Sequence, residues 1–300
     1  MKRIYVTSLN RVSDPNEDGD LGKLYVLDWD TKKIIPHSLE SDTINIGRSR
    51  GVRGIEYVDN YLIVAGVTNK LSAYNADTML LIKEWEVAET KFLHQIRLDN
   101  EGFLALASTG NDRIIRASNR KTYFIEELSW NKDIIDPYIT HPNACPWGGD
   151  RLHFNSLAWD ENGDEYHIYN APRIIFNYTK QEVFAQGGPL LAMHDIVFMD
   201  NHLIVNASGD RTTLAIDRVT KEIRVIHKSR RYPNSEHNLH GMTRGLAAWK
   251  DYLFIGSTPG DLTLYQKKGN EYFFISNFQL TQDPKESIFD ILLDPRDWIE

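Results

Sequence analysis

The chain has 300 residues, 41% of them hydrophobic, so it can bury a large core in one or two domains. Lysine and arginine together number 34 against 42 aspartates and glutamates, and the net charge of -8 argues against nucleic acid or an anionic membrane as a partner. The sequence has no apolar run of about 18 residues to span a bilayer, and its single cysteine, Cys145, favours a reducing, cytoplasmic compartment.

Three strand-like segments open the chain, at residues 3–7, 22–27 and 32–35. Each is rich in β-branched or aromatic residues, which favour strands. The apolar run after Lys2 and Arg3 is too short for a secretory signal. These segments resemble the last three strands of a four-stranded unit whose first strand lies elsewhere.

A complete four-strand unit begins at Arg53 and recurs along the chain. In its first copy, strand-like residues 54–58, 61–65, 70–74 and 79–82 are separated by turn-forming Asn, Asp and Thr residues. Related units begin at His94, Asn155, His194 and Arg244. A recurrence of roughly 40 to 60 residues, with four short strands in each unit, is typical of the blades of a β-propeller.

The repeats predict an all-β chain folded as a single six-bladed β-propeller domain over residues 1–300. The blades are expected at residues 53–92, 93–130, 153–188, 192–229, 243–281, and 286–298 joined with 2–45. Pairing the C-terminal strand with the N-terminal strands would close the ring and remove its open edges. A pair of β-sandwiches would also space strands evenly, but complementary half-units at the two termini favour the propeller.

Each repeat begins with a polar residue that can bind a ligand. These residues are Arg53, His94, Asn155, His194 and Arg244, with a sixth position near Phe289 or Asp290. Because the innermost strands of a propeller line its central channel, we expect the side chains to converge at one mouth of that channel. Polar residues at the start of a strand can instead have a structural role, by hydrogen bonding to unpaired backbone groups. A channel that only had to be filled could use small or apolar residues and avoid the cost of gathering partly buried cations.

Two arginines and two histidines around one axis would create a positive centre in an acidic protein. We expect Arg53 and Arg244 to bind a small anionic molecule through a carboxylate, phosphate or sulfate group. His194 or His94 would then act as the catalytic acid or base. This combination suits β-elimination, epimerisation or hydrolysis, and it also suits binding without catalysis.

A divalent metal is the alternative chemistry for these residues. His94, Asn155 and His194, with Asp290, could ligate one, but the two arginines would oppose a cation. The repeat also carries no recurring carboxylate of the kind that binds Ca²⁺. No cofactor is therefore firmly predicted.

Loops are expected to wall the same mouth. The long segment 133–149 carries Trp147 and is interpreted as a binding loop or a packed Ω-loop. Segment 230–243 carries His237 and His240 and leads into Arg244. Within the blades, Asn170 and Asp210 are the preferred substrate contacts, although such residues are first of all turn formers. These side chains complete the predicted substrate site.

Three repeat openings resemble those of an uncharacterised bacterial β-propeller family, which implies a propeller without a particular activity. They are residues 153–159 (HFNSLAW), 193–196 (MHDI) and 242–247 (MTRGLA). More distantly, the pattern is similar to the gluconolactonase and senescence-marker six-bladed propellers, which hold a divalent metal through Glu, Asn and Asp. Asn155 stands at such a place, whereas Arg53 stands where their first Glu would fall. The site is similar in character to that of virginiamycin-type and uronate lyases, propellers that use a histidine for elimination.

The sequence therefore predicts an enzyme of the lyase, epimerase or hydrolase type acting on a small anionic substrate, such as a sugar acid. The alternative is a non-catalytic propeller that binds a small ligand or a protein partner, since propellers host both. No nucleic acid or membrane is expected as a partner, and the sequence does not indicate an oligomeric state.

Overall fold

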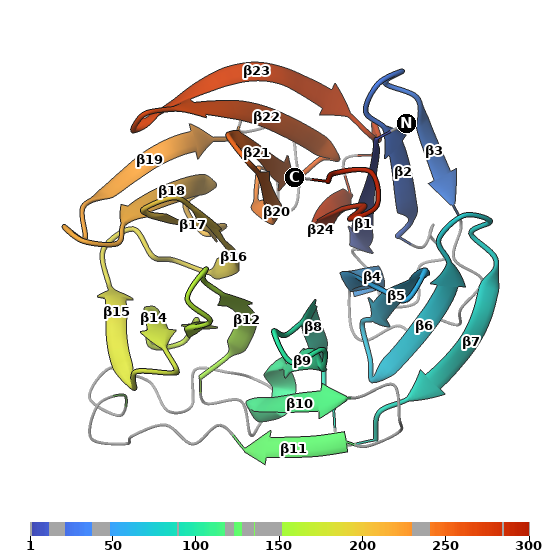
Figure 1. Cartoon of the computed structure of the whole chain (residues 1–300), viewed down its shortest axis with the longest axis horizontal. Helices are drawn as coiled ribbons and strands as arrows, with labels where there is room; N and C mark the ends of the chain where they lie inside the picture. Colours follow the sequence, from blue (N-terminus) through green and yellow to red (C-terminus); the bar gives the residue numbers. More distant parts are fainter. Residues whose placement is uncertain are drawn as a thin grey trace.

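Strands make up almost all of the regular structure in the computed structural model of this chain. The model describes residues 2–11, 22–37, 49–88, 90–117, 123–127, 135, 152–229, 241–283 and 285–299. Figure 1 shows the strands gathered into sheets around a common centre, which is the arrangement of a β-propeller. Within these residues, no helix has the length and apolarity needed to cross a bilayer.

Four of the sheets in the described residues contain four antiparallel strands each. One comprises β8 (Leu93–Leu98), β9 (Leu104–Ser108), β10 (Arg113–Ala117) and β11 (Tyr123–Glu127). The next comprises β12 (Phe154–Trp159), β13 (Glu165–Tyr169), β14 (Ile174–Asn177) and β15 (Glu182–Gln186). A third comprises β16 (Met193–Met199), β17 (His202–Ala207), β18 (Thr212–Asp217) and β19 (Ile223–Lys228). The fourth comprises β20 (Thr243–Trp249), β21 (Tyr252–Ser257), β22 (Asp261–Lys268) and β23 (Glu271–Gln279).

The remaining sheet has eight strands and joins the two ends of the chain. One half comprises β24 (Glu286–Leu293), β1 (Arg3–Arg11), β2 (Leu24–Asp28) and β3 (Ile34–His37). The other half comprises β4 (Ser49–Val58), β5 (Tyr61–Gly66), β6 (Lys70–Asn75) and β7 (Leu81–Glu86). The halves meet where β1 pairs with β4 over three positions, from Leu9 opposite Gly51 to Arg11 opposite Ser49.

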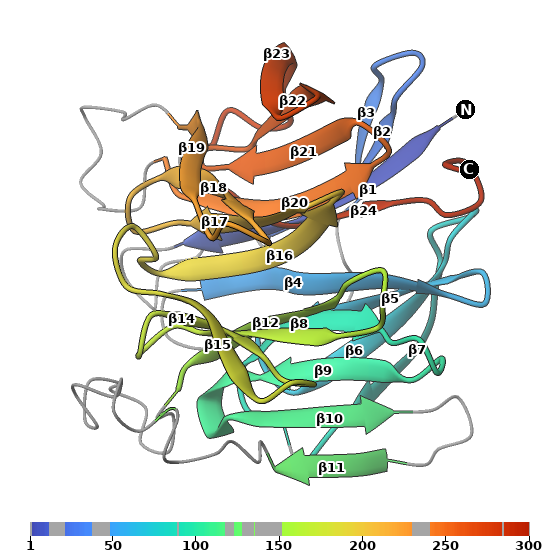
Figure 2. The same ribbon diagram turned by 60° about the vertical axis from the view of Figure 1, so that its left-hand side comes forward.

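The expected pairing of the C-terminal strand with the N-terminal strands is present. β24 runs antiparallel to β1, from Ile4 opposite Leu293 to Asn10 opposite Glu286 (Figure 2). Around the centre of Figure 1, the innermost strands are β4, β8, β12, β16, β20 and β24. Each of these strands contacts the next, and β24 contacts β4. The first strand of every repeat therefore faces the centre.

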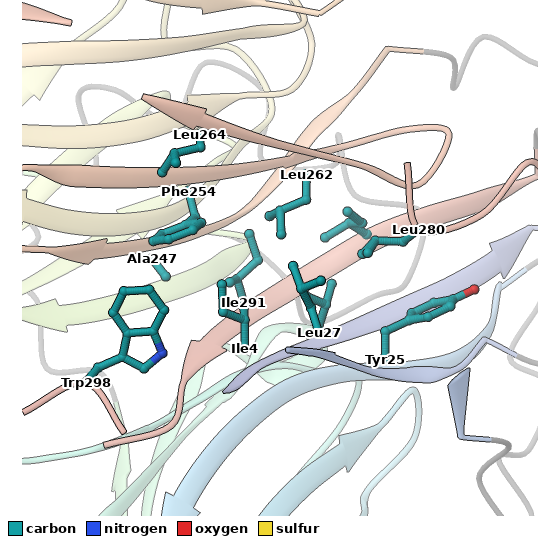
Figure 3. Packing of buried hydrophobic residues seen from close by; sticks show 12 residues of the cluster. Ile4, Tyr25, Leu27, Ala247, Phe254, Leu262, Leu264, Leu280, Ile291 and Trp298 are labelled. Carbon is teal, nitrogen blue, oxygen red and sulfur yellow. The ribbon is translucent and has the colours of Figure 1, made fainter. Parts of the chain in front are cut away.

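Burial follows the distance of a strand from this centre. The second strands β9 and β17 are buried at every position, because sheets cover both of their faces. The outer strands β19 and β23 contain only exposed and half-buried positions. The largest apolar clusters fill the spaces between adjacent sheets. In the cluster of Figure 3, Ile4 of β1 lies beside Ile291 of β24 and near Phe254 and Trp298.

Every inner strand is irregular at or next to the residue that begins its repeat. In β4, Arg53 and Gly54 lie between the pairs Val52–Gly66 and Ile55–Val64, so two residues face the single residue Ala65. Equivalent register shifts fall at residues 94–95 of β8, 155 of β12, 195 of β16, 244–245 of β20 and 289 of β24. A β-bulge of this kind redirects the side chain that it carries. The sequence repeat therefore marks a ring of bulges.

Candidate functional site

Four of the predicted side chains converge on Phe289, the bulged residue of β24. The guanidinium carbons of Arg53 and Arg244 lie 5.5 and 5.1 Å from the centroid of its ring. The imidazole centroids of His94 and His194 lie 5.6 and 6.4 Å from the same ring. Residues from five different repeats are thus brought together at the centre of the molecule. We refer to Arg53, His94, His194, Arg244 and Phe289 as the central cluster.

The two histidines of the central cluster face one another. Their ring centroids are 6.0 Å apart, and the ring planes differ by 24°. A third histidine, His153, packs edge-on against His94 at 5.8 Å. His153 was not among the predicted site residues, because it stands two positions before the residue that aligns with His94 in the repeat. Its left-handed backbone, with φ of 53°, is not evident from the sequence.

Arg53 fixes the tautomer of His94. Its Nη1 donates to the Leu93 carbonyl at 3.0 Å and to His94 Nδ1 at 2.8 Å. The Phe92 carbonyl lies farther from the same Nδ1, at 3.4 Å. Because a guanidinium is always protonated and has no acceptor, its closer contact assigns a lone pair to Nδ1 and the ring proton to Nε2. Burial, followed by the charge of Arg53, lowers the pKa of His94 well below its usual value. His94 is therefore a neutral ring that donates through Nε2.

His194 is held in the opposite tautomer. Its Nδ1 lies 2.8 Å from the Ala192 carbonyl and 3.0 Å from Ser208 Oγ. The Ser208 hydroxyl donates to the Thr243 carbonyl at 2.5 Å, so it accepts from the imidazole. Since a carbonyl can only accept, Nδ1 carries the proton, and the neutral form of this ring has its lone pair on Nε2. The stacked pair thus combines a hydrogen-bond donor with a proton acceptor.

The arginine and histidine side chains of the central cluster are almost fully enclosed, at 6% to 9% exposed. Asn155, which begins another repeat, is 2% exposed. Asn155 Nδ2 donates to the Met193 carbonyl at 2.9 Å, next to His194. Its buried Oδ1 accepts no hydrogen bond from any described residue. Charges and dipoles held away from water interact more strongly with a ligand than they would at an open surface.

A largely buried polar network adjoins the central cluster along the inner strands. It is formed by the residues that follow His94 and His194, namely Gln95 and Asp195, together with Ser156, Asp290 and Arg97. Gln95 Nε2 donates to Asp195 Oδ1 at 3.0 Å, and Arg97 binds both oxygens of Asp290 at 2.7 and 2.8 Å. Burial, followed by the charge of Asp290, raises the pKa of Asp195 to about 7.

Two predicted loop residues lie within the described part of the chain, and Asn170 has a local structural partner. Asn170 is half-buried, and its Oδ1 accepts from the Met193 backbone amide at 2.9 Å, which ties the loop after β13 to the start of β16. Asp210 is exposed in the turn between β17 and β18. Trp147, His237 and His240 lie outside the described residues. The contribution of these five side chains to a ligand site stays a prediction.

Within the described ranges, no group of three or more His, Cys, Asp or Glu side chains is arranged to hold a metal ion. The alternative metal set combines His94, Asn155 and His194. His94 Nδ1 already accepts from Arg53, whose charge would oppose a cation. The donor set around Phe289 therefore suits an anion better than a metal.

A cleft of about 510 Å³ lies at the other end of the strands. It is lined by residues of the turns that follow β12, β16 and β18, including Glu161, Asp200 and Arg218. The central cluster lies at the beginning of the same inner strands, so the two features are on opposite faces. Arg218 is paired with Glu161 at 2.6 Å and so lends the cleft little net charge.

No protein-family model and no curated protein sequence match this chain. Solved structures match it at low sequence identity. The nidogen/laminin complex contains a chain with a TM-score of 0.61, 11% identity, and coverage of 96% of this chain and 97% of that one. Virginiamycin B lyase from Staphylococcus aureus matches with a TM-score of 0.54 and 13% identity, and the match covers 94% of this chain and 90% of the lyase chain. The periplasmic gluconolactonase of Pseudomonas aeruginosa matches with a TM-score of 0.54 and 8% identity, and the match covers 92% of this chain and 83% of the gluconolactonase chain.

These similarities extend over nearly the whole chain. At such identities they establish the propeller fold, and they carry no activity over to this protein. The predicted resemblance to gluconolactonase-type propellers is confirmed as a likeness of fold. The neighbours include lyases and lactonases as well as a protein named for its complex with laminin. The function must therefore be argued from the central cluster itself.

Proposed function

We propose that the central cluster is the active site of an enzyme that removes a proton beside the carboxylate of a small anionic substrate, such as a sugar acid. The single observation that carries this proposal is the convergence of two arginines and a stacked histidine pair on Phe289. We also propose that the eight-stranded sheet represents two blades, so that the chain forms a closed six-bladed propeller. The single cysteine supports a cytoplasmic location.

The arginines would bind the substrate carboxylate. Their guanidinium carbons lie 5.5 and 5.1 Å from the centroid of the same ring, that of Phe289. One small ligand beside this ring can therefore reach both side chains. A guanidinium pairs with a carboxylate through two parallel hydrogen bonds. Such pairing would place the carbon next to the carboxylate near the histidine pair.

The two tautomers would divide the proton chemistry. His194 Nε2 takes the proton as the C–H bond breaks, while the Nε2–H of neutral His94 donates a hydrogen bond to the carboxylate oxygen on which charge develops. The C–H electron pair forms a carbon–carbon double bond as the bond from the β-carbon to its oxygen substituent breaks. His194 then returns its proton to the departing oxygen. Atoms and charge balance without an external oxidant or reductant, and an elimination of the lyase type is the best match.

A thermal-shift screen of sugar acids, other carboxylates, phosphate and sulfate tests this proposal. Ligands should stabilise the parent protein and should lose most of that effect with Arg53→Gln plus Arg244→Gln. Arg224→Gln is the matched control, because this partly exposed arginine lies on outer strand β19 and pairs with Glu271 at 3.4 Å. Ligands that bind should next be tested for the ultraviolet absorbance of a newly formed conjugated double bond.

Three results separate the alternatives. Stabilisation with product formation supports the enzyme. Stabilisation that depends on the arginines, but without product from any bound acid, supports a non-catalytic binding protein instead. If no anion stabilises the parent, or if the double variant responds like the parent, the central cluster is not an anion site.

A further inference from the structure

The side chain of Asp195 connects three of the strands that carry the central cluster. Its Oδ1 accepts from Gln95 Nε2 of β8 at 3.0 Å, and its Oδ2 accepts from the Gly245 amide of β20 at 2.8 Å. Asp195 itself belongs to β16 and is the bulged residue there, with φ of 52°. One carboxylate therefore links the bulges of β8, β16 and β20.

Each partner of Asp195 is adjacent in sequence to a residue of the central cluster. Gln95 follows His94, Asp195 follows His194, and Gly245 follows Arg244. A shift in either hydrogen bond would therefore change how an imidazole or guanidinium is aimed. Asp195 is 4% exposed and is not a member of the ring around Phe289, so any effect on a ligand would act through its neighbours.

The orientation of Gln95 is fixed from its other side. The Leu157 amide and the Ser156 hydroxyl both donate to Gln95 Oε1, at 2.9 and 2.6 Å. A backbone amide can only donate, so the acceptor oxygen of Gln95 must face β12 and its NH₂ group must face Asp195. The carboxylate cannot be replaced by an amide without placing two donors opposite each other.

We propose that Asp195 is a positioning residue for the central cluster, holding His94, His194 and Arg244 in register through Gln95 and Gly245. Its charged surroundings are Asp290 of β24, Arg97 of β8 and Arg244 of β20. Burial and Asp290 both disfavour its ionised form, so a carboxyl here is costly. Such a cost is common where a group serves a functional site. This inference rests on the proposed function of the cluster.

Asp195→Asn and Gln95→Glu, made singly and together, test the proposal. Asp195→Asn places two hydrogen-bond donors opposite each other, and Gln95→Glu places two carboxylates opposite each other. The double variant restores one donor facing one acceptor, at unchanged net charge. Asp160→Asn is the control, because Asp160 is equally buried but pairs with Arg218 on the opposite face. Binding of inorganic phosphate would be measured by calorimetry. The ring nitrogens of His94 and His194 would be observed by NMR without ligand.

The direction of the effect separates positioning from charge. Neutralising a carboxylate that acted only through its charge would strengthen phosphate binding. A positioning role predicts that both single variants bind about fivefold more weakly or worse and that the double variant recovers most of the loss. It also predicts altered ring-nitrogen signals in both single variants and parent-like signals in the double variant and in Asp160→Asn.

Two results would overturn the role of Asp195. One is parent-like ring-nitrogen signals in both single variants, and the other is a double variant as impaired as the worse single variant. If phosphate does not bind to the parent, the phosphate arm counts against the proposed function alone. The ring-nitrogen signals, which need no ligand, then decide whether Asp195 positions the histidines.

Discussion

Burial favours the neutral form of several histidines in this protein. It is the largest factor lowering the pKa of His94, His202 and His227. Nearby arginines further lower the pKa of His94, whereas burial alone lowers the pKa of His227. A ring that stays neutral in the folded protein but accepts a proton when unfolded makes stability depend on pH. His227 is therefore the simpler place to measure this effect.

His227 should make the protein less stable as the pH falls. Burial lowers its pKa to about 4, while the unfolded chain binds a proton near the usual value of 6.5. Stability is fully present above the unfolded pKa and is lost as the pH falls toward the folded pKa. Between about pH 7.5 and pH 5, the parent should lose up to about 2 kcal/mol more than His227→Gln.

Urea unfolding at the two pH values gives this difference directly. Glutamine cannot titrate, and it can still bond to the Tyr265 hydroxyl, which His227 Nδ1 contacts at 3.0 Å. Parallel loss of stability in parent and variant would show that His227 is not neutral in the folded protein.

At the scale of elements, the bulges require close approach between inner strands. Gly54 shares the bulge of β4 with Arg53, and a Cβ atom added there would lie 2.6 Å from the Ile96 amide nitrogen of β8. That contact is with backbone, so relief requires the strands to separate. Movement of β4 from β8 would also pull Arg53 from His94, to which it is bonded at 2.8 Å.

Gly54→Ala should therefore damage both stability and the site. We expect a loss of about 2 kcal/mol or more in the free energy of unfolding and weaker binding of any anion that the central cluster holds. Gly66→Ala is the control, because its added Cβ would meet neighbours only at 3.5 Å or beyond. Comparable losses in the two variants would contradict a special role for the β4–β8 contact.

The sequence predicts the central cluster better than it predicts what supports it. Arg53, His94, His194 and Arg244 were recognisable because each begins a copy of the same repeat. The bulges were not, since a two-against-one register depends on the partner strand. Asp195 was read as part of a repeat, yet its bonds to Gln95 and Gly245 join residues distant in sequence. The same limit applies to Ser208, whose hydrogen bond with His194 is not evident from the sequence.

For the whole molecule, the two ends of the chain depend on each other. Besides the β1–β24 ladder, Arg3 Nε donates to Asp297 at 2.7 Å, and the Tyr5 hydroxyl donates to Asp294 at 2.8 Å. Ile288, Ile291 and Trp298 share one apolar cluster with residues of β1, β2 and β20–β22. β24 also supplies Phe289, on which the central cluster converges. Without β24, the inner strands β20 and β4 would each lose a neighbour.

Deleting residues 285–300 should therefore abolish cooperative unfolding and expose apolar surface. A synthetic peptide of those residues should restore cooperative unfolding and cover that surface again. The peptide adds the missing strand beside β1, where the deletion would leave the backbone N–H and C=O groups of the strand edge unpaired. Its Trp298 would report docking by a shift of its fluorescence, because that ring packs against Trp249 and Phe254 at 5.1 and 5.7 Å. A peptide with Ile288→Asp and Ile291→Asp is the control, since both side chains belong to the cluster that it must fill. A shortened chain that unfolds like the parent, or a control peptide that restores it equally well, would show that β24 is not what holds the first and last sheets together.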